Sequence, residues 1–593
     1  MKVNRLKVIF KTIPLAFSAS KKLFIADVLL SIVSGFFGVA IVYTTTHLFD
    51  TVGTIQNTDN GIIFHDIIIA LVLYFSVLIV KELIDWISDS LSFIISEKSI
   101  IALSEMLHEK ANKIDPISFE NPKLLDYIEN AGRGIYFIDY CSKNVINLFL
   151  RDIPYLFFVG FYLYSLKPIL FWIPILIFIP VVISQLLRTK MFVQLKDEKA
   201  PLERKLSKYS SYMIDADFFK ETRTLGCFAY FKKLYIDTLS ILNAKTWKTE
   251  RRSQTMEITS KFITLAGYYG VLFLLFTTLM EGTISVGAFA AVFASLQTLY
   301  STANHIIVDR IGSILTGEFA EINSMINYLT IPDRIYGNRD SSQGTIQLKK
   351  VSFSYPGREE SVVSNVDLSI EQGDIIAIVG ENGSGKTTLA KIILGIYTPS
   401  AGSVFIDEKP YSELSREALF GEKSAVFQNY YKYLFNLQDN IIISDMGFEP
   451  IQEKIDIASK KAGVNVTNEE VFPDGYKTLL SKRFGGVELS GGEWQRVAIA
   501  RGFYREGNVI VLDEPTAAID PIEEGNVYRR FVDMSKGKTT IIITHRLGST
   551  KMANRIIVMR RGEIIQSGNH KTLMQQDGLY KKMYESQAAW YID

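Results

Sequence analysis

The sequence predicts an all-α membrane domain of six helices followed by a soluble α/β domain. Apolar runs long enough to cross a bilayer occur only within about the first 330 of the 593 residues. The rest of the chain alternates apolar and polar residues like an ordinary soluble domain, and a chain of this length is expected to form more than one domain. We expect a membrane domain at 1–330, a polar linker at 331–343 and the soluble domain at 344–593.

Each predicted span is a stretch of about 20 or more mostly apolar residues. The first span follows a basic, interrupted N-terminus without a small-residue cleavage site. We therefore expect a retained membrane helix and no removable signal peptide. The six spans are predicted at 22–47, 62–98, 145–164, 168–187, 256–280 and 284–312.

Positive charges predict how these spans are oriented. No Lys or Arg lies between His47 and Asp66, so this loop is expected to face outward. The segment 188–254 is dense in Lys and Arg and is expected on the cytoplasmic side, together with the N-terminus and the soluble domain. Apolar residues recur at helical spacing in both long inward loops, so we expect helices to continue past the membrane there. Solvated linkers are the alternative.

Some polar residues lie within or near the predicted spans, where charge is costly and tends to be functional. We interpret Glu257, Lys261 and Arg310 as interfacial residues whose long side chains reach water. The polar run YSTANH at 300–305 lies nearer the middle of the sixth span and is a candidate cavity lining.

Composition excludes some classes of function. The net charge of +1 gives no reason to expect binding to nucleic acid. Cys141 and Cys227 are far apart, so they indicate neither a disulfide framework nor a zinc site.

The soluble domain contains a glycine-rich turn between an apolar strand and a helix, IIAIVGENGSGKTTLAKIILG. This turn matches the phosphate-binding pattern GxxxxGK[ST] in its required context. Glycines allow backbone N–H groups to close round a phosphate chain, Lys386 supplies a positive charge, and the Thr387 hydroxyl can hold Mg²⁺. The residues expected to bind the nucleotide here are Gly380, Glu381, Asn382, Gly383, Ser384, Gly385, Lys386, Thr387 and Thr388.

Five further residues have types and positions that suit phosphate chemistry. Asp513 ends the apolar strand VIVL, where parallel sheets bind ligands, and is positioned for the Mg²⁺ shell. Glu514 follows it as a candidate to polarise the attacking water. His545 and Gln428 each end another apolar stretch; His545 could contact a terminal phosphate, and Gln428 could touch Mg²⁺ or water. Tyr355 could stack on a purine.

The stretch VELSGGEWQRVAIAR at 487–501 places Ser490, Gly491 and Gly492 at a predicted helix start. Backbone N–H groups at such a start, with a hydroxyl beside them, suit an anion. The sequence therefore predicts a second anion-binding element outside the glycine-rich turn.

Together these motifs resemble the ATP-binding cassette superfamily, and six spans ahead of one cassette resemble a half-size ABC exporter. The matching pieces are GENGSGKTT (Walker A), Gln428 (Q-loop), LSGGEWQ (signature), VIVLDE (Walker B), AAID (D-loop), ITHR (switch histidine) and Tyr355 (A-loop). The resemblance implies an ATP hydrolase with a P-loop fold that uses ATP and Mg²⁺. It implies Lys386 on the phosphates, Thr387, Gln428 and Asp513 at Mg²⁺, Glu514 as general base and His545 at the γ-phosphate.

In this family the signature serine and glycines touch ATP held by the other subunit, so the resemblance implies a dimer, most simply of identical chains. It also implies coupling helices near 118–131 and 220–235. One departure stands out: LSKRFGG at 480–486 replaces the TEVGERG type of segment, which puts the contact that couples the subunits in doubt.

The amino-acid sequence of the cassette is similar to that of exporters of lantibiotics and other bacterial peptides. This implies export of a peptide across the bacterial plasma membrane by alternating access. Because spans begin almost at once, no N-terminal peptidase domain is expected. The alternatives are export of amphipathic drugs or lipids and, from a different class, an ATP-gated channel.

Overall fold

The structure is a computed structural model with two compact units. One unit comprises Met1–Asn112 and Asp126–Ile331, and the other comprises Lys113–Leu125 and Pro332–Asp593. The short segment Lys113–Leu125 therefore belongs to the second unit, although the helices on either side of it belong to the first. The D-loop residues 517–520 lie outside the described residues. The residues that the structure describes are 13–15, 17–18, 20–53, 60–312, 319–340, 344–447, 449–515, 525, 527, 529–530, 537–546 and 548–589.

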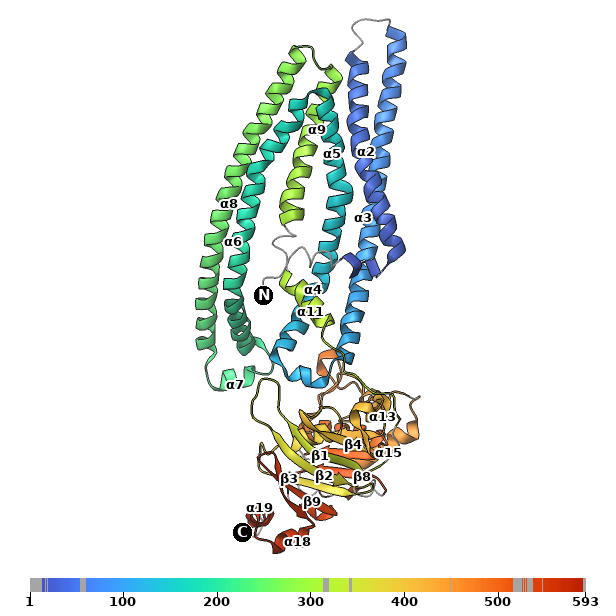
Figure 1. The fold of residues 1–593 in the computed structure, drawn as a ribbon, viewed down its shortest axis with the longest axis vertical. Coiled ribbons are helices and arrows are strands. Elements are labelled where there is room, and N and C mark those ends of the chain that lie inside the picture. Colours follow the sequence, from blue (N-terminus) through green and yellow to red (C-terminus); the bar gives the residue numbers. More distant parts are fainter. Residues whose placement is uncertain are drawn as a thin grey trace. The chain divides into compact units, whose positions relative to one another are not determined.

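The first unit is helical in the part of the chain that the structure describes (Figure 1). Short π-helical segments interrupt two of its spans, η3 (Leu148–Asp152) and η4 (His305–Ile311). The α-helices are α2 (Lys21–Gly53), α3 (Asn60–Lys113), α4 (Pro122–Asn147), α5 (Ile153–Leu166), α6 (Pro168–Ile214), α7 (Phe219–Thr224), α8 (Phe228–Met280), α9 (Val286–Asn304) and α11 (Phe319–Leu329).

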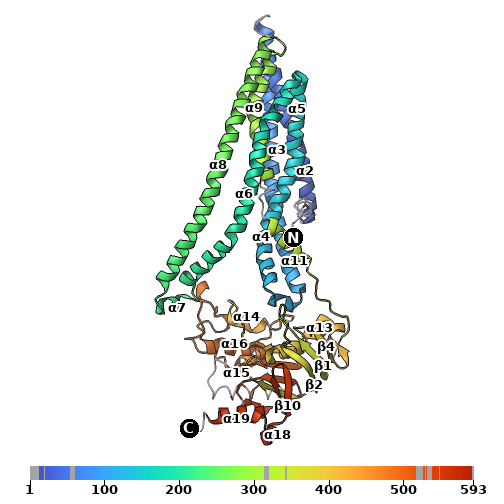
Figure 2. The same cartoon turned by 60° about the vertical axis from the view of Figure 1, so that its left-hand side comes forward.

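Six helical stretches among the described residues are long and apolar enough to span a membrane, which confirms the predicted fold class. Most run well beyond a single span. Helix α8 has 53 residues and, at the rise of an α-helix, measures about 80 Å, against about 30 Å of hydrocarbon. Helices α6 and α8 lie side by side (Figures 1 and 2). The predicted continuation of the helices is confirmed, and the solvated-linker alternative is wrong.

The structure corrects the interfacial interpretation of Arg310. Its side chain is only 5% exposed, lies in an ion pair with Asp152, and donates from Nη1 to Asn144 Oδ1 at 3.1 Å. Arg310 lies in η4 and Asp152 in η3, so each π-helical segment supplies one partner. Sequence spacing could not indicate this pairing, because the two residues are far apart in the chain. Lys261, by contrast, remains 56% exposed and pairs with Glu257 at 2.6 Å.

The second unit contains two sheets. The smaller is antiparallel, with strand order β2-β1-β4-β5, and the larger has the order β10-β9-β3-β8-β7-β6. Within the larger sheet every neighbouring pair is parallel except β10 with β9. The strands are β1 (Ile346–Phe353), β2 (Val363–Ile370), β3 (Ile375–Gly380), β4 (Ala401–Ile406), β5 (Lys409–Pro410), β6 (Lys423–Val426), β7 (Val509–Asp513), β8 (Thr539–Ile543), β9 (Arg555–Arg560) and β10 (Glu563–Gly568).

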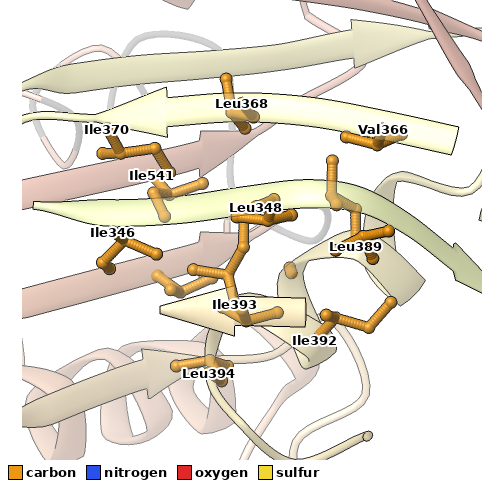
Figure 3. Packing of buried hydrophobic residues seen from close by; sticks show 14 of the residues in the cluster. Ile346, Leu348, Val366, Leu368, Ile370, Leu389, Ile392, Ile393, Leu394 and Ile541 are labelled. Atoms are coloured by element: carbon orange, nitrogen blue, oxygen red, sulfur yellow. The ribbon is translucent and has the colours of Figure 1, made fainter. Parts of the chain in front are cut away.

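A buried hydrophobic cluster joins both sheets to the helix that follows the glycine-rich turn (Figure 3). Leu348 of β1, Ile393 of α12 and Ile541 of β8 all belong to it. The α-helices of this unit are α12 (Lys386–Ile393), α13 (Arg416–Phe420), α14 (Leu437–Ile442), α15 (Gln452–Ala462), α16 (Gly491–Tyr504), α18 (His570–Gln575) and α19 (Leu579–Ala589), and its 3₁₀ turns are η2 (Pro116–Glu120), η5 (Tyr411–Glu413), η6 (Gly475–Lys477), η7 (Lys482–Phe484) and η8 (Ser549–Met552).

Candidate nucleotide site

The candidate site lies at the carboxyl ends of four adjacent parallel strands, β3, β8, β7 and β6. The glycine-rich turn follows β3, Glu514 follows β7, and His545 and Gln428 come within two residues after β8 and β6. Open parallel sheets bind ligands at this edge, because the loops after the strands converge there. Most residues of these four strands are buried, so the core fixes the positions of the strand ends.

The glycine-rich turn needs glycine at particular positions. Gly383 and Gly385 have φ values of +78° and +98°, a region that residues with a Cβ rarely adopt. The ammonium of Lys386, the first residue of α12, donates to the carbonyl oxygens of Gly380 and Glu381, both at 3.0 Å. Burial lowers the pKa of Lys386, while the carboxylates of Glu514 and Asp513 oppose this shift. A cation is therefore held inside the turn.

A cavity of about 380 Å³ opens at this edge. The Ser384 hydroxyl lining it is buried and has no hydrogen-bond partner in the structure. An unsatisfied buried hydroxyl beside a cation suits an anionic, oxygen-rich ligand. The cavity is lined by Val362, Asn382, Gly383, Ser384, Gly385, Lys386, Thr387, Thr388, Gln428, Glu514 and His545.

Oxygen donors suitable for Mg²⁺ lie together beside this cavity. The Thr387 hydroxyl donates to Asp513 Oδ1 at 3.2 Å. Burial raises the pKa of Asp513, and the hydrogen bond from Thr387 opposes that shift. A hydroxyl, a carboxylate and the Gln428 amide oxygen are hard ligands of the kind Mg²⁺ prefers. Among the described residues no group of three or more His, Cys, Asp and Glu could hold a metal, so the remaining ligands would come from phosphate and water.

Glu514 is the centre of a three-residue hydrogen-bonded group. Its Oε2 accepts from the Gln428 amide at 2.9 Å, and its Oε1 pairs with His545 Nε2. Burial raises the pKa of Glu514 and lowers that of His545, which favours the uncharged form of each. Glu514 also has a φ of +48°, an uncommon conformation for a residue with a side chain, and such strain is frequent at functional sites.

Tyr355 lies next to the cavity lining. Its hydroxyl is 3.1 Å from that of Thr388, and its ring packs edge-on against Phe353 at 5.2 Å. Tyr355 and Asp513 are not among the residues that line the cavity itself.

The signature residues Ser490, Gly491 and Gly492 do not line this cavity either. Ser490 caps α16: its hydroxyl accepts from the Glu493 N–H at 3.3 Å, and the Glu493 carboxylate accepts from the Ser490 N–H at 2.7 Å. A single chain therefore presents two separate elements suited to phosphate. Sequence reasoning missed the role of Glu493, although the spacing Ser-x-x-Glu is a recognisable capping box.

Two sequence families match the chain. The ABC transporter transmembrane region matches residues 24–303, and the ABC transporter family matches residues 363–517. The second match contains the glycine-rich turn, Gln428, the signature residues and Glu514.

Relatives and a solved structure support these matches. Subtilin transport ATP-binding protein SpaT of Bacillus subtilis is 28% identical over 97% of this chain and 94% of its own length. Nisin transport ATP-binding protein NisT of Lactococcus lactis is 26% identical over 97% and 95%. An ATP-dependent lipid A-core flippase of Legionella pneumophila is 34% identical over 51% of each chain. A bacterial Atm1-family ABC exporter with ATP bound has the same fold, with a TM-score of 0.79, 19% identity, and coverage of 96% of this chain and 99% of that one.

Proposed function

This chain belongs to the ABC transporter superfamily as an ATP-hydrolysing exporter, and from that premise we propose that its cargo is a peptide of the lantibiotic class. This proposal rests on the share of the chain that each relative matches. Two relatives that align over nearly the whole chain are named for transport of subtilin and nisin, which are lantibiotics. The lipid A-core flippase aligns over only about half of it.

The nucleotide site supports specific roles for its residues. Lys386 and the backbone N–H groups of the turn at 380–388 bind the phosphates of ATP. Thr387, Asp513 and Gln428 would hold Mg²⁺, which would supply positive charge to neutralise the phosphates. Glu514 accepts a proton from the attacking water, since its carboxylate lies at the cavity and is oriented by two partners. His545 contacts the terminal phosphate, and Tyr355 stacks on the adenine.

The working unit is a homodimer. Each chain has one glycine-rich turn and one signature, and the signature residues do not line the chain's own cavity. In a pair of chains, the N-terminus of α16 in one copy closes the cavity of the other, and both composite sites are complete. The proposed domains are a membrane domain at 1–330 and a cassette at 344–593, with Lys113–Leu125 in the same compact unit as the cassette.

The proposed location is the bacterial plasma membrane, with the N-terminus and the nucleotide-binding domain in the cytoplasm. The charge distribution supports this orientation, because the Lys- and Arg-rich segment 188–254 precedes the fifth span. ATP binds the closed cassette pair more tightly than the open pair. This difference in affinity shifts the membrane domain between inward and outward openings.

The decisive experiment is uptake into inverted vesicles that contain the full chain. Labelled nisin and subtilin should accumulate against a gradient with ATP, and Glu514→Gln should abolish accumulation. A fluorescent phospholipid and an amphipathic dye test the runner-up cargo classes in the same vesicles. Transport of lipid or dye without either peptide would refute the peptide proposal. Passive ion current that survives Glu514→Gln would indicate an ATP-gated channel.

A further inference from the structure

A short segment of the second unit joins the catalytic carboxylate to the start of the signature helix. Gln428 donates to Glu514 Oε2 at 2.9 Å, and two residues later the hydroxyl of Tyr430 donates to the carbonyl oxygen of Gly491 at 3.0 Å. Gly491 is the first residue of α16, directly after its N-cap Ser490. Both hydrogen bonds lie within one chain and link elements that the sequence keeps far apart.

The residues that follow are also attached to α16. Arg501, near the end of the helix, donates to the carbonyl oxygen of Tyr431 at 2.7 Å, and its guanidinium lies 4.9 Å from the centre of the Tyr433 ring. Tyr430 is half-buried and packs against the hydrophobic cluster that includes residues of α16. Burial raises the pKa of Tyr430, so its phenol stays protonated and able to donate at neutral pH.

Three consecutive residues span at most about 7 Å between the first and the last Cα atoms. Gln428 is hydrogen-bonded at one end and Tyr430 is hydrogen-bonded and packed at the other, so only one residue separates the two attachment points. The hydrogen bond to Gly491 would carry a shift of Gln428 into the first turn of α16, which holds Ser490 and Gly492.

We propose that Tyr430 is a positioning residue that couples the two nucleotide sites of the dimer, by linking Glu514 in a chain's own site to the helix start that completes the partner's site. The inference rests on the proposed dimeric function. Its consequence is that the state of one site changes the affinity of the other for ATP, so that nucleotide binding is cooperative.

The test compares Tyr430→Phe with Tyr431→Phe in the full-length protein in nanodiscs. Tyr430→Phe keeps the ring and its packing but removes the donor to Gly491. Tyr431 is the matched control, because its side chain is 71% exposed and its hydrogen bond with Arg501 uses the backbone carbonyl, which the substitution keeps. Two readouts are independent of turnover: amide hydrogen exchange at Gly492 and Glu493 without nucleotide, and the Hill coefficient for binding of a non-hydrolysable ATP analogue.

We expect wild type and Tyr431→Phe to bind the analogue with a Hill coefficient above 1. In Tyr430→Phe the coefficient should fall to 1, and exchange at the start of α16 should rise about five-fold, as expected for loss of one neutral hydrogen bond. The melting temperature should stay unchanged. Wild-type exchange and cooperativity in Tyr430→Phe, or no cooperativity in wild type, would overturn the inference. A wild-type chain that dimerises and binds ATP without transporting peptide would refute only the proposed cargo.

Discussion

The hydroxyl of Tyr397 donates to the carboxylate of Glu120 at 2.5 Å, across 277 positions of sequence. Glu120 ends η2 in the segment that connects α3 with α4, and Tyr397 lies beyond the end of α12. The ring of Tyr397 stacks on Phe353 at 5.3 Å and meets Tyr355 edge-on at 6.0 Å. A connector between two membrane-spanning helices is thus in contact, through one tyrosine, with the aromatic residue proposed to hold adenine.

Tyr397→Phe should weaken coupling between the connector and the cassette. The change removes a charge-assisted hydrogen bond but keeps the aromatic stack, so we expect intact ATP binding and at least about a five-fold loss of cargo-stimulated ATPase activity. Tyr411→Phe is the matched control, because its buried hydroxyl donates to Ile393 within the cassette and does not reach the connector. Equal stimulation in both variants would contradict this prediction.

Glu514→Gln and Lys386→Ala should separate binding from hydrolysis. Glutamine at 514 can still accept from Gln428 but cannot take up a proton, so this variant should bind ATP, accumulate closed dimers and hydrolyse at least about 100-fold more slowly. Lys386→Ala removes the cation held inside the turn and should weaken nucleotide binding at least about ten-fold. Calorimetric titration measures the ATP affinity of each variant, and size analysis measures the fraction of closed dimers. Equal ATP affinity in the three proteins would refute these roles.

Local patterns predicted most of the residues that meet in the candidate site, because phosphate-binding motifs are short and contiguous. The turn at 380–388 and the pair Asp513–Glu514 could be placed at strand ends from apolar runs alone. The partners of Glu514 were identified as candidates, but their hydrogen bonds depend on strand order, which the sequence does not state. Helix periodicity likewise indicated the long extensions of the spans, whereas the burial of Arg310 required a partner on another helix. Long-range pairs such as Tyr397 with Glu120 have no local signal.

Lys423 predicts a specific dependence of stability on pH. It is buried at the start of β6, where its ammonium donates to the carbonyl oxygens of Ile393 and Leu394. Burial, and secondarily the charge of Arg334, lower the pKa of Lys423 from 10.5 to about 7. Between these values the unfolded chain binds more protons, so this contribution to stability is present above about pH 10.5 and is lost as the pH falls toward 7.

Replacing Lys423 should therefore raise stability relative to wild type most at neutral pH. We expect Lys423→Met to lose the hydrogen bonds of the Lys423 side-chain nitrogen at any pH, but its melting temperature relative to wild type should rise as the pH is lowered from 10 to 7. Lys432→Met controls for removal of a charge from an exposed position. Thermal unfolding followed by fluorescence at several pH values measures the difference. A pH-independent difference for Lys423→Met would show that this lysine keeps an ordinary pKa.

Glu493→Gln should strengthen closure of the dimer by ATP. The carboxylate of Glu493 accepts from the Ser490 N–H, so a negative charge lies at the helix start proposed to meet the partner's γ-phosphate. Glutamine can maintain the same capping box without the charge. We expect the ATP concentration for half-maximal activity to fall about two- to five-fold, with unchanged thermal stability. Glu493→Ala, which also loses the cap, should be less stable. An unchanged or higher ATP requirement in Glu493→Gln would contradict the prediction.

The buried pair Asp152–Arg310 should behave as one unit in the stability of the membrane domain. Asp152→Asn takes the carboxylate away from the buried Arg310, a loss of about 3–5 kcal/mol, and should markedly lower the melting temperature. Arg310→Gln should lower it less, because Asp152 keeps its ion pair with Arg151 at 3.2 Å. The double variant removes both charges of the buried pair and should be more stable than the sum of the single effects predicts. Thermal unfolding in nanodiscs provides the double-mutant cycle, and Lys261→Gln, at an exposed pair, is the control with little effect. Additive losses would mean that the two side chains act independently.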